Sequence, residues 1–183
     1  MLATKEYDRA RALLYARRWA FARNPLFNDY SDLGGDCTNF ASQCLLAGTL
    51  VMNETETFGW YYKSDDDRAP AWTGVEAFYD FFTGSGDFAP VTLREGPFGY
   101  VTERQYAQLG DVIQLADSDG DFYHTLMITG FDGGEILVSA HSDDSLDRPL
   151  SSYTNASERI IHVIGITVPD DAEYTDDCFE RII

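Results

Sequence analysis

Residues 34–48 decide the fold, and they read Gly34-Gly35-Asp36-Cys37-Thr38-Asn39-Phe40-Ala41-Ser42-Gln43-Cys44-Leu45-Leu46-Ala47-Gly48. Two glycines interrupt the preceding segment, Asp36 is a residue type that caps helix N-termini, and apolar residues then recur at helical spacing until Gly48, a C-cap. The stretch therefore predicts a buried helix that begins at Cys37. The N–H groups and dipole of a helix N-terminus favour a thiolate, so we expect a lowered pKa for the Cys37 thiol.

The segments on either side of this helix predict an α+β domain. Apolar spacing predicts a helix over residues 7–22, and a short helix follows Trp72-Thr73, with Thr73 as its N-cap. From residue 91 onward the pattern changes to strands, which we expect at 91–93, 111–115, 123–129, 135–141 and 159–168. Helices come first and an antiparallel meander second, so we expect residues 1–183 to form one domain with N-terminal helices packed on an antiparallel sheet.

The composition excludes several classes of partner. The chain has 31 acidic and 13 basic residues, a formal charge of −18, which repels phosphate backbones and anionic lipid headgroups. Nucleic acid and membrane surfaces are therefore not expected as partners. No stretch approaches the ~20 apolar residues of a membrane span, and residues 1–8 lack the apolar core of a signal peptide. The chain as given is expected in the cytoplasm, or outside the cell if it is a domain of a longer exported protein.

The three cysteines do not predict a disulfide framework. Cys37, Cys44 and Cys178 cannot all pair within one chain. Cys37 and Cys44 also lie seven residues apart on one helix, too far along its axis to bridge easily.

Two kinds of metal site have partial support in the sequence. Residues 117–121 imitate the start of a calcium loop, but the glycine is misplaced and position twelve is Ile128 instead of Glu. Zinc held by Cys37, His124 and His141 has a plausible ligand set, but the chain has no short Cys-x-x-Cys or His-Glu-x-x-His spacing. We therefore expect no metal and no cofactor.

Two histidines fall at facing strand ends. His124 opens one predicted strand and His141 closes the next, and the short Gly133-Gly134 turn between them predicts a hairpin that brings both imidazoles to one sheet edge. A Cys at a helix N-terminus beside a strand His is the arrangement of cysteine hydrolases, in which a third polar group orients the imidazole. The alternative is that each is a structural histidine, which is our interpretation of His162.

Motifs along most of the chain resemble one family. The segments that carry the resemblance are Tyr7-Asp8-Arg9 to Trp19-Ala20, Arg23-Asn24-Pro25, Gly35 to Cys44, Gly59-Trp60-Tyr61-Tyr62, Trp72-Thr73-Gly74 and the His124 strand. Together they resemble the putative amidase domain family of the papain-like cysteine peptidase superfamily, from about Tyr7 to Tyr153. The strand at Gly110-Asp111 also resembles that of the NlpC/P60 and CHAP groups. The resemblance implies a papain-like, NlpC/P60-like fold.

The resemblance also implies roles for individual residues. Cys37 would be the nucleophile, His124 the base, and His141 the third polar group, with Asp143 as the alternative. A hydrogen-bonded Cys37–His124 pair is expected at ~4 Å. Six residues before Cys37, where papain has its oxyanion Gln, stands Ser31, so only the Cys37 N–H is assigned to the oxyanion.

Two functions are compatible with these residues. The first is a cysteine-dependent amide hydrolase that acts on a peptide or peptidoglycan-stem amide through an acyl-enzyme. The second is a non-catalytic module that recognises a peptide or glycan through Trp60, Tyr61 and Trp72. In either case we expect Trp60 and Trp72 to line the groove, and Asp65, Asp66 and Asp67 to make its rim negative and favour substrates with free amines.

Overall fold

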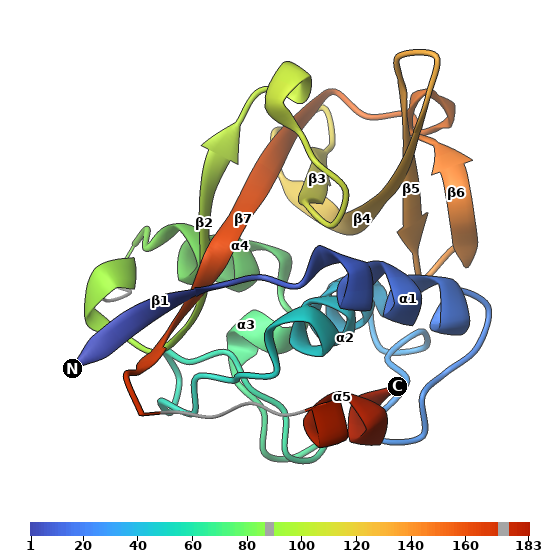
Figure 1. Ribbon diagram of the computed structural model, residues 1–183. Helices are drawn as coiled ribbons and strands as arrows, with labels where there is room; N and C mark the ends of the chain where they lie inside the picture. Colours follow the sequence, from blue (N-terminus) through green and yellow to red (C-terminus); the bar gives the residue numbers. More distant parts are fainter. Residues whose placement is uncertain (87–89, 172–175) are drawn as a thin grey trace.

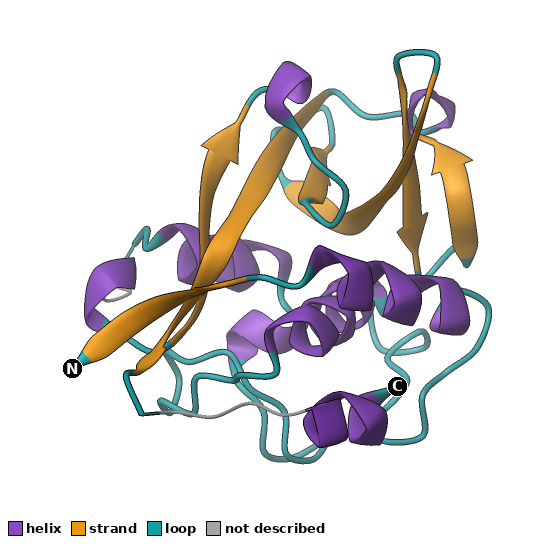
Figure 2. Cartoon of the chain, viewed as in Figure 1, coloured by secondary structure: helices purple, strands orange, loops and turns teal. Residues whose placement is uncertain are grey.

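The helices and the sheet form two layers. The computed structural model describes residues 1–86, 90–171 and 176–183. In the view of Figure 1 most of the helices lie below a seven-stranded antiparallel sheet, and β1 crosses from the helical layer to pair with β7. Figure 2 shows the same division: the longer purple helices lie in the lower half and most of the orange strands above them, with short purple turns at the top of the sheet. The expected combination of helices with an antiparallel sheet is thus confirmed.

The helices follow the predicted order with changed bounds. They are α1 (Arg9–Trp19), α2 (Cys37–Thr49), α3 (Pro70–Thr73), α4 (Val75–Thr83) and α5 (Asp176–Ile182), with 3-10 turns η1 (Val91–Leu93), η2 (Arg104–Tyr106) and η3 (Leu150–Ser152). The prediction of a strand at 91–93 is therefore wrong, because these residues form η1. The N-cap of α4 is Gly74 and not Thr73 as predicted. No helix in the described part of the chain is long and apolar enough to cross a membrane.

The C-terminus of α2 differs from the prediction. Gly48 is inside the helix, and the cap is Leu50 (φ 57°), whose N–H donates to the Leu46 carbonyl at 2.7 Å. A glycine is needed at position 48 for space, because a Cβ there would lie 2.3 Å from Cε2 of Tyr7. The glycine therefore lets the start of the chain pack directly on the helix that carries Cys37.

The strands form one sheet, in which β2 lies outside the main strand order. They are β1 (Leu2–Glu6), β2 (Gly96–Thr102), β3 (Val112–Ala116), β4 (Phe122–Asp132), β5 (Glu135–Ala140), β6 (Ser145–Pro149) and β7 (Ser157–Pro169). The order is β1-β7-β3-β4-β5-β6, and β2 also pairs with β7. The predicted strands β3, β4, β5 and β7 are confirmed. The other three were missed because β1 is largely exposed, β2 is rich in glycine and β6 is polar.

The two faces of the sheet contribute to two cores. Val112, Met127 and Ile161 point toward the helices and pack with residues such as Phe40. The alternate residues, among them Ile113, Leu126 and Ile160, fill a second cluster on the other face. Because side chains alternate along a strand, consecutive residues of β4 reach different surroundings. This alternation places Thr125 toward α2 and is important for the site described below.

Candidate active site

Cys37 lies against β4, the strand that carries His124. The hydroxyl of Thr38 hydrogen-bonds the hydroxyl of Thr125 at 2.9 Å, and the Cys37 sulfur lies 3.9 Å from Thr38 Oγ1. The backbone of Thr125 also hydrogen-bonds the Cys37 sulfur. The residues that follow Cys37 and His124 in the sequence are therefore in direct contact, so the first turn of α2 is held at the first residues of β4.

The thiol of Cys37 is less acidic than the sequence suggested. Its side chain is only 7% exposed, and this burial raises its pKa above the ordinary value for a thiol. Hydrogen bonds from the backbone of Thr125 and from Thr38 oppose the increase but do not cancel it. The expected lowering of the Cys37 pKa is thus wrong, because the cost of removing the thiolate from water exceeds the effect of the helix terminus.

The imidazole of His124 is neutral at physiological pH. It is 9% exposed, and burial lowers its pKa to about 4; the charge of Asp143 opposes this shift, whereas that of Arg148 adds to it. The ring lies 5.8 Å from that of Tyr153, between centroids. No hydrogen bond joins His124 to Cys37 in the described part of the chain, so the predicted hydrogen-bonded pair is absent and both groups are neutral at rest.

His141 hydrogen-bonds Asp36 and Trp19 and not His124 as predicted. Its Nδ1 lies 2.6 Å from Oδ2 of Asp36, its Nε2 lies 2.8 Å from the carbonyl oxygen of Trp19, and its ring stacks on Phe40 with centroids 4.0 Å apart. Both partners have oxygen acceptors, so both ring nitrogens are engaged in hydrogen bonds. Because neither nitrogen is available to His124, the predicted role of His141 in orienting that ring does not agree with the structure.

Asp36 is the centre of a buried network at the start of α2. Its carboxylate accepts from the Tyr30 N–H at 3.0 Å and from the Asn39 amide at 2.7 Å, and Arg23 Nε lies 3.3 Å from it. Asp36 is fully buried, and its side chain makes no hydrogen bond to the helix N–H groups. The predicted N-cap residue therefore fixes the loop before the helix and the histidine beyond β5 instead of capping α2.

A second contact ties the end of β5 to α2. The N–H of Asp36 donates to the hydroxyl of Ser142 at 2.6 Å, and Ser142 has φ 78°. Arg23 reaches Asp144 at 2.9 Å in the same loop. The loop after β5 is thus attached to the N-terminus of α2 through both the backbone and the side chain of Asp36.

Asp143, the alternative third residue, lies in this loop. Its side chain is 75% exposed and pairs with Arg148 on β6. It is close enough for its charge to raise the pKa of His124, although no hydrogen bond joins the two. Asp143 is therefore better placed than His141 to act on the His124 ring.

The tryptophans expected in the groove belong to the core. Trp60 and Trp72 are fully buried, with ring centroids 4.9 Å apart. The Trp60 indole N–H donates to Ser42 Oγ at 3.0 Å, and that of Trp72 donates to Asn39 Oδ1 at 2.8 Å. The prediction that they line a groove is wrong, because they hydrogen-bond the polar side chains of α2. Their neighbour Tyr61 is buried too.

These bonds explain why α2 is polar as well as buried. All of its residues are buried, and its polar side chains bond to other elements: Thr38 to Thr125, Asn39 to Trp72, Ser42 to Trp60, and Gln43 to Tyr15 at 2.7 Å. Buried polar groups are costly unless they are paired. The polar residues of the motif therefore reflect which side chains surround this helix.

A pocket of about 380 Å³ lies beside the glycines that precede Cys37. It is lined by Tyr30, Leu33, Gly34, Gly35, Asp65, Asp66, Arg68 and Thr73. Asp65 accepts from the Tyr30 hydroxyl at 2.8 Å and from Arg68. Two carboxylates and one guanidinium line this pocket, so its formal charge is negative. Two of the three predicted rim aspartates are thus at this pocket.

The remaining sequence candidates occupy other positions. Ser31 donates to Asp29 at 2.6 Å, so its hydroxyl proton is already engaged. Cys44 is a free, fully buried thiol on α2, and the side chain of Cys178 lies outside the described residues. Within the described ranges, no group of three His, Cys, Asp or Glu side chains could hold a metal ion.

Three residues of the site were not predicted from the sequence. The contact of Thr125 with Thr38 could have been anticipated, because Thr125 comes directly after His124 and alternation along the strand turns its side chain toward the helices. Arg148 and Tyr153 gave no such indication, since both depend on the undetected strand β6 and the turn after it.

Comparisons with known proteins give one family and two bacterial relatives. The profile of the family described as "Putative amidase domain" matches residues 6–164. "Uncharacterized protein YhbB" of Bacillus subtilis (strain 168) is 33% identical over 144 residues, which cover 76% of this chain and 43% of that protein. "Uncharacterized protein YjcM" of the same strain is 28% identical over 161 residues, covering 84% and 35% respectively. The chain thus spans less than half the length of these relatives. No solved structure matches it.

Proposed function

Because the chain belongs to the family described as "Putative amidase domain", we propose that it is a cysteine-dependent amide hydrolase. The family match agrees with the resemblance drawn from the motifs. In the proposal, Cys37 is the nucleophile and His124 the general base.

The contact between Thr38 and Thr125 is the observation that carries this proposal. It joins the residues after Cys37 and His124 at 2.9 Å, so the first turn of α2, which carries the proposed nucleophile, is held against the strand that carries the proposed base. A hydrogen bond between a nucleophile and its base is often long in the absence of substrate and shortens when substrate binds. A neutral thiol beside a neutral imidazole is also a competent starting state, since His124 can accept the proton as sulfur attacks.

The proposed reaction has two steps. In this proposal His124 takes the proton of Cys37 while the sulfur attacks the amide carbon, and the Cys37 N–H stabilises the oxyanion. His124 then gives this proton to the leaving amine, and a thioester remains on Cys37. Water, activated by His124, hydrolyses the thioester and restores the thiol. Asp143 is the third polar residue, through its charge on His124.

The proposed fold relationship is papain-like. A Cys at the start of a buried helix against an antiparallel sheet, with the His on a strand of that sheet, supports it. We further propose a single domain for residues 1–183, because β1 at one end of the chain pairs with β7 near the other, from Leu2↔Pro169 to Glu6↔Gly165.

The proposed substrate is an amide in a peptide or peptidoglycan stem that carries a free amine. The negatively charged pocket beside Gly34 and Gly35 supports this choice, because these glycines come three and two residues before Cys37. Asp65 and Asp66 in the pocket can attract a cationic group of the substrate. Substrates rich in phosphate or carboxylate are disfavoured by the same charge.

One observation favours a second function, a peptide- or glycan-binding module without catalysis. Cys37 and His124 make no hydrogen bond to each other within the described residues, and the burial of each group opposes its charged form. The aromatic cleft first assigned to this function is absent, since Trp60 and Trp72 are buried. A binding module would instead use the pocket beside Gly34.

Hydrolysis of two matched peptide anilides tests the proposal. One carries lysine and the other glutamate at the same position, and release of the aniline is measured with the wild-type chain, Cys37→Ala and Cys44→Ala. We expect faster release from the lysine peptide, loss of activity in Cys37→Ala and retention in Cys44→Ala. Release that persists in Cys37→Ala would contradict the cysteine mechanism. Binding of the lysine peptide without release by the wild type would support the binding module.

A further inference from the structure

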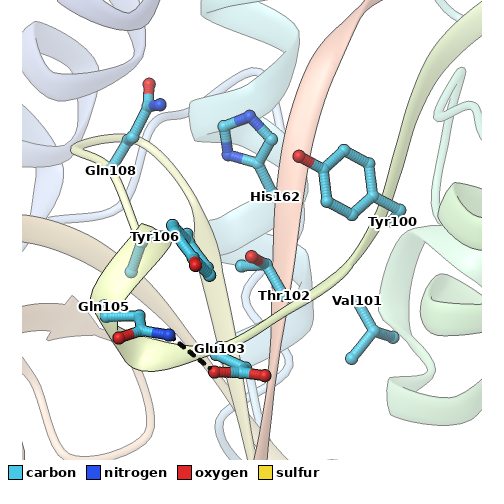
Figure 3. Close-up of a pocket in the computed structure, with 9 residues that line it drawn as sticks. Tyr100, Val101, Thr102, Glu103, Gln105, Tyr106, Gln108 and His162 are labelled. Carbon is cyan, nitrogen blue, oxygen red and sulfur yellow. Dashed lines mark hydrogen bonds between the residues drawn. The ribbon is translucent and has the colours of Figure 1, made fainter.

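One cavity is lined by elements other than those that carry Cys37 and His124. It has a volume of about 750 Å³ and is formed by β2, the η2 segment and β7, whereas Cys37 and His124 belong to α2 and β4. Its lining is Tyr100, Val101, Thr102, Glu103, Gln105, Tyr106, Ala107, Gln108 and His162 (Figure 3). This volume lies within the ~300–1,000 Å³ of pockets that bind small molecules. The proposed hydrolase chemistry uses none of these residues.

His162 presents a hydrogen-bond acceptor to this pocket. Its Nδ1 lies 2.9 Å from Oδ2 of Asp111, a fully buried carboxylate, so Nδ1 carries the proton. Arg9 Nη1 lies 2.8 Å from the other oxygen of Asp111 and balances its charge. In the neutral ring Nε2 is then an acceptor, and it has no partner among the described residues. The Asp111 contact also fixes the orientation of the ring.

Two exposed tyrosines provide flat apolar surfaces around the same hollow. Tyr100 is 50% exposed and Tyr106 is 63% exposed, and the Tyr100 ring lies 5.2 Å from that of His162. Figure 3 shows Tyr100 and Tyr106 on either side of His162 and Thr102. Exposed tyrosines on a rigid strand and a tight turn can contact a ligand at low cost in side-chain entropy.

The polar groups of the pocket are almost all neutral. In a chain with a formal charge of −18, Glu103 is the single charged residue of the lining, and it already accepts from the Gln105 amide at 2.8 Å. The other polar groups are the hydroxyl of Thr102, the amides of Gln105 and Gln108 and the phenols of the tyrosines. A lining of this kind can both donate and accept hydrogen bonds, but it contains no cation for a phosphate or carboxylate.

We propose that this pocket, named here the Tyr100–Tyr106 pocket, binds a sugar ring of a neutral oligosaccharide. A pyranose has an apolar C–H face for the tyrosine rings and hydroxyls that donate to His162 Nε2 and accept from the glutamine amides. It carries no negative charge for the acidic surface to repel. The site uses none of the residues proposed for hydrolysis at Cys37 and would hold a glycan on β2, η2 and β7.

Calorimetric titration of the full chain with two neutral tetrasaccharides, tetra-N-acetylchitotetraose and maltotetraose, tests this site. We expect at least one of them to bind, and Tyr100→Ala and Tyr106→Ala each to weaken that binding about tenfold. Phe21→Ala, which removes an aromatic ring of similar exposure outside the pocket, and Cys37→Ala should both bind as the wild type does. Binding of neither sugar, or binding that both tyrosine variants leave unchanged, would overturn the proposal.

A second measurement requires no variant. Amide NMR shifts recorded during the same titration of the wild type should change at residues 100–108 and 162. Shift changes confined to Gly34, Gly35 and Cys37 would instead show that the sugar binds at the hydrolase site. That result would overturn the proposal that it binds the Tyr100–Tyr106 pocket. Because this arm uses no amidase substrate, its outcome is independent of whether Cys37 hydrolyses anything.

Discussion

Asp36 Oδ2 and His141 Nδ1 lie 2.6 Å apart, although the two residues are 105 positions apart along the chain and both side chains are almost completely buried. This hydrogen bond fixes the residue before Cys37 to the residue after β5. It therefore determines where the start of α2 lies relative to the sheet. A pair of this kind is costly to form but also costly to break from one side.

Breaking this pair is expected to destabilise the fold strongly. His141→Ala leaves Asp36 charged and buried with only Arg23 as a cation, so we expect the free energy of unfolding to fall by about 3–5 kcal/mol in urea denaturation. His162→Ala is the matched control, because Asp111 retains Arg9 there and the expected loss is smaller. A double-mutant cycle of Asp36→Asn with His141→Gln should give a clear coupling energy. Equal losses in His141→Ala and His162→Ala would contradict the assignment.

The reactivity of Cys37 should reveal its raised pKa. In a Cys178→Ser background, a thiol-specific reagent is expected to modify Cys37 faster than Cys44, because Cys37 is 7% exposed and Cys44 is fully buried. Burial favours the neutral thiol, so the rate at Cys37 should still be rising with pH above the ordinary thiol range. A rate that reaches a plateau below about pH 8 would show a lowered pKa instead, and Cys37→Ala identifies the signal.

The pH dependence of hydrolysis should follow His124. The base must be neutral to accept the thiol proton, and burial lowers the pKa of His124 to about 4. Activity on the lysine peptide is therefore expected to be lost only as pH falls through about 4 in a kcat/KM profile. His124→Asn should lower kcat by about 10²–10⁴. An acid limb near the ordinary histidine pKa of about 6.5 would indicate an unperturbed ring.

The two charges near His124 should shift its pKa in opposite directions. Asp143→Asn removes a negative charge that raises the His124 pKa, so the pKa should fall further. Arg148→Gln removes a positive charge that lowers it, so the pKa should rise. NMR titration of the imidazole protons measures both variants without a substrate. Shifts of the same sign in the two variants would exclude the arrangement described here.

The tryptophans of the core should show their hydrogen bonds in stability measurements. Trp60→Phe and Trp72→Phe keep an aromatic ring but remove the N–H donors to Ser42 and Asn39, and we expect each to cost about 1–3 kcal/mol in urea denaturation. Trp19→Phe is a matched control, because the Trp19 N–H is buried without a partner among the described residues, so its removal costs less. Similar losses in all three variants would show that ring volume alone matters.

Much of the fold was predictable where local patterns are strong. Helix α2 begins at Cys37 as predicted, and β3, β4, β5 and β7 follow the alternating segments. The missed strands β1, β2 and β6 have weak patterns of their own and depend on pairing with β7 or β5, which no local sequence window contains.

The sequence by itself determined the family and the two chemically important side chains, since a Cys at a helix start and a His at a strand start are local features. The tertiary structure alone decided what each group does. Burial set the direction of both pKa shifts, because desolvation depends on what surrounds a residue and not on its neighbours in the chain. The packing also decided that His141 hydrogen-bonds Asp36 and that the tryptophans hydrogen-bond side chains of α2. A buried polar atom must bond to whichever acceptor or donor lies next to it in the folded chain.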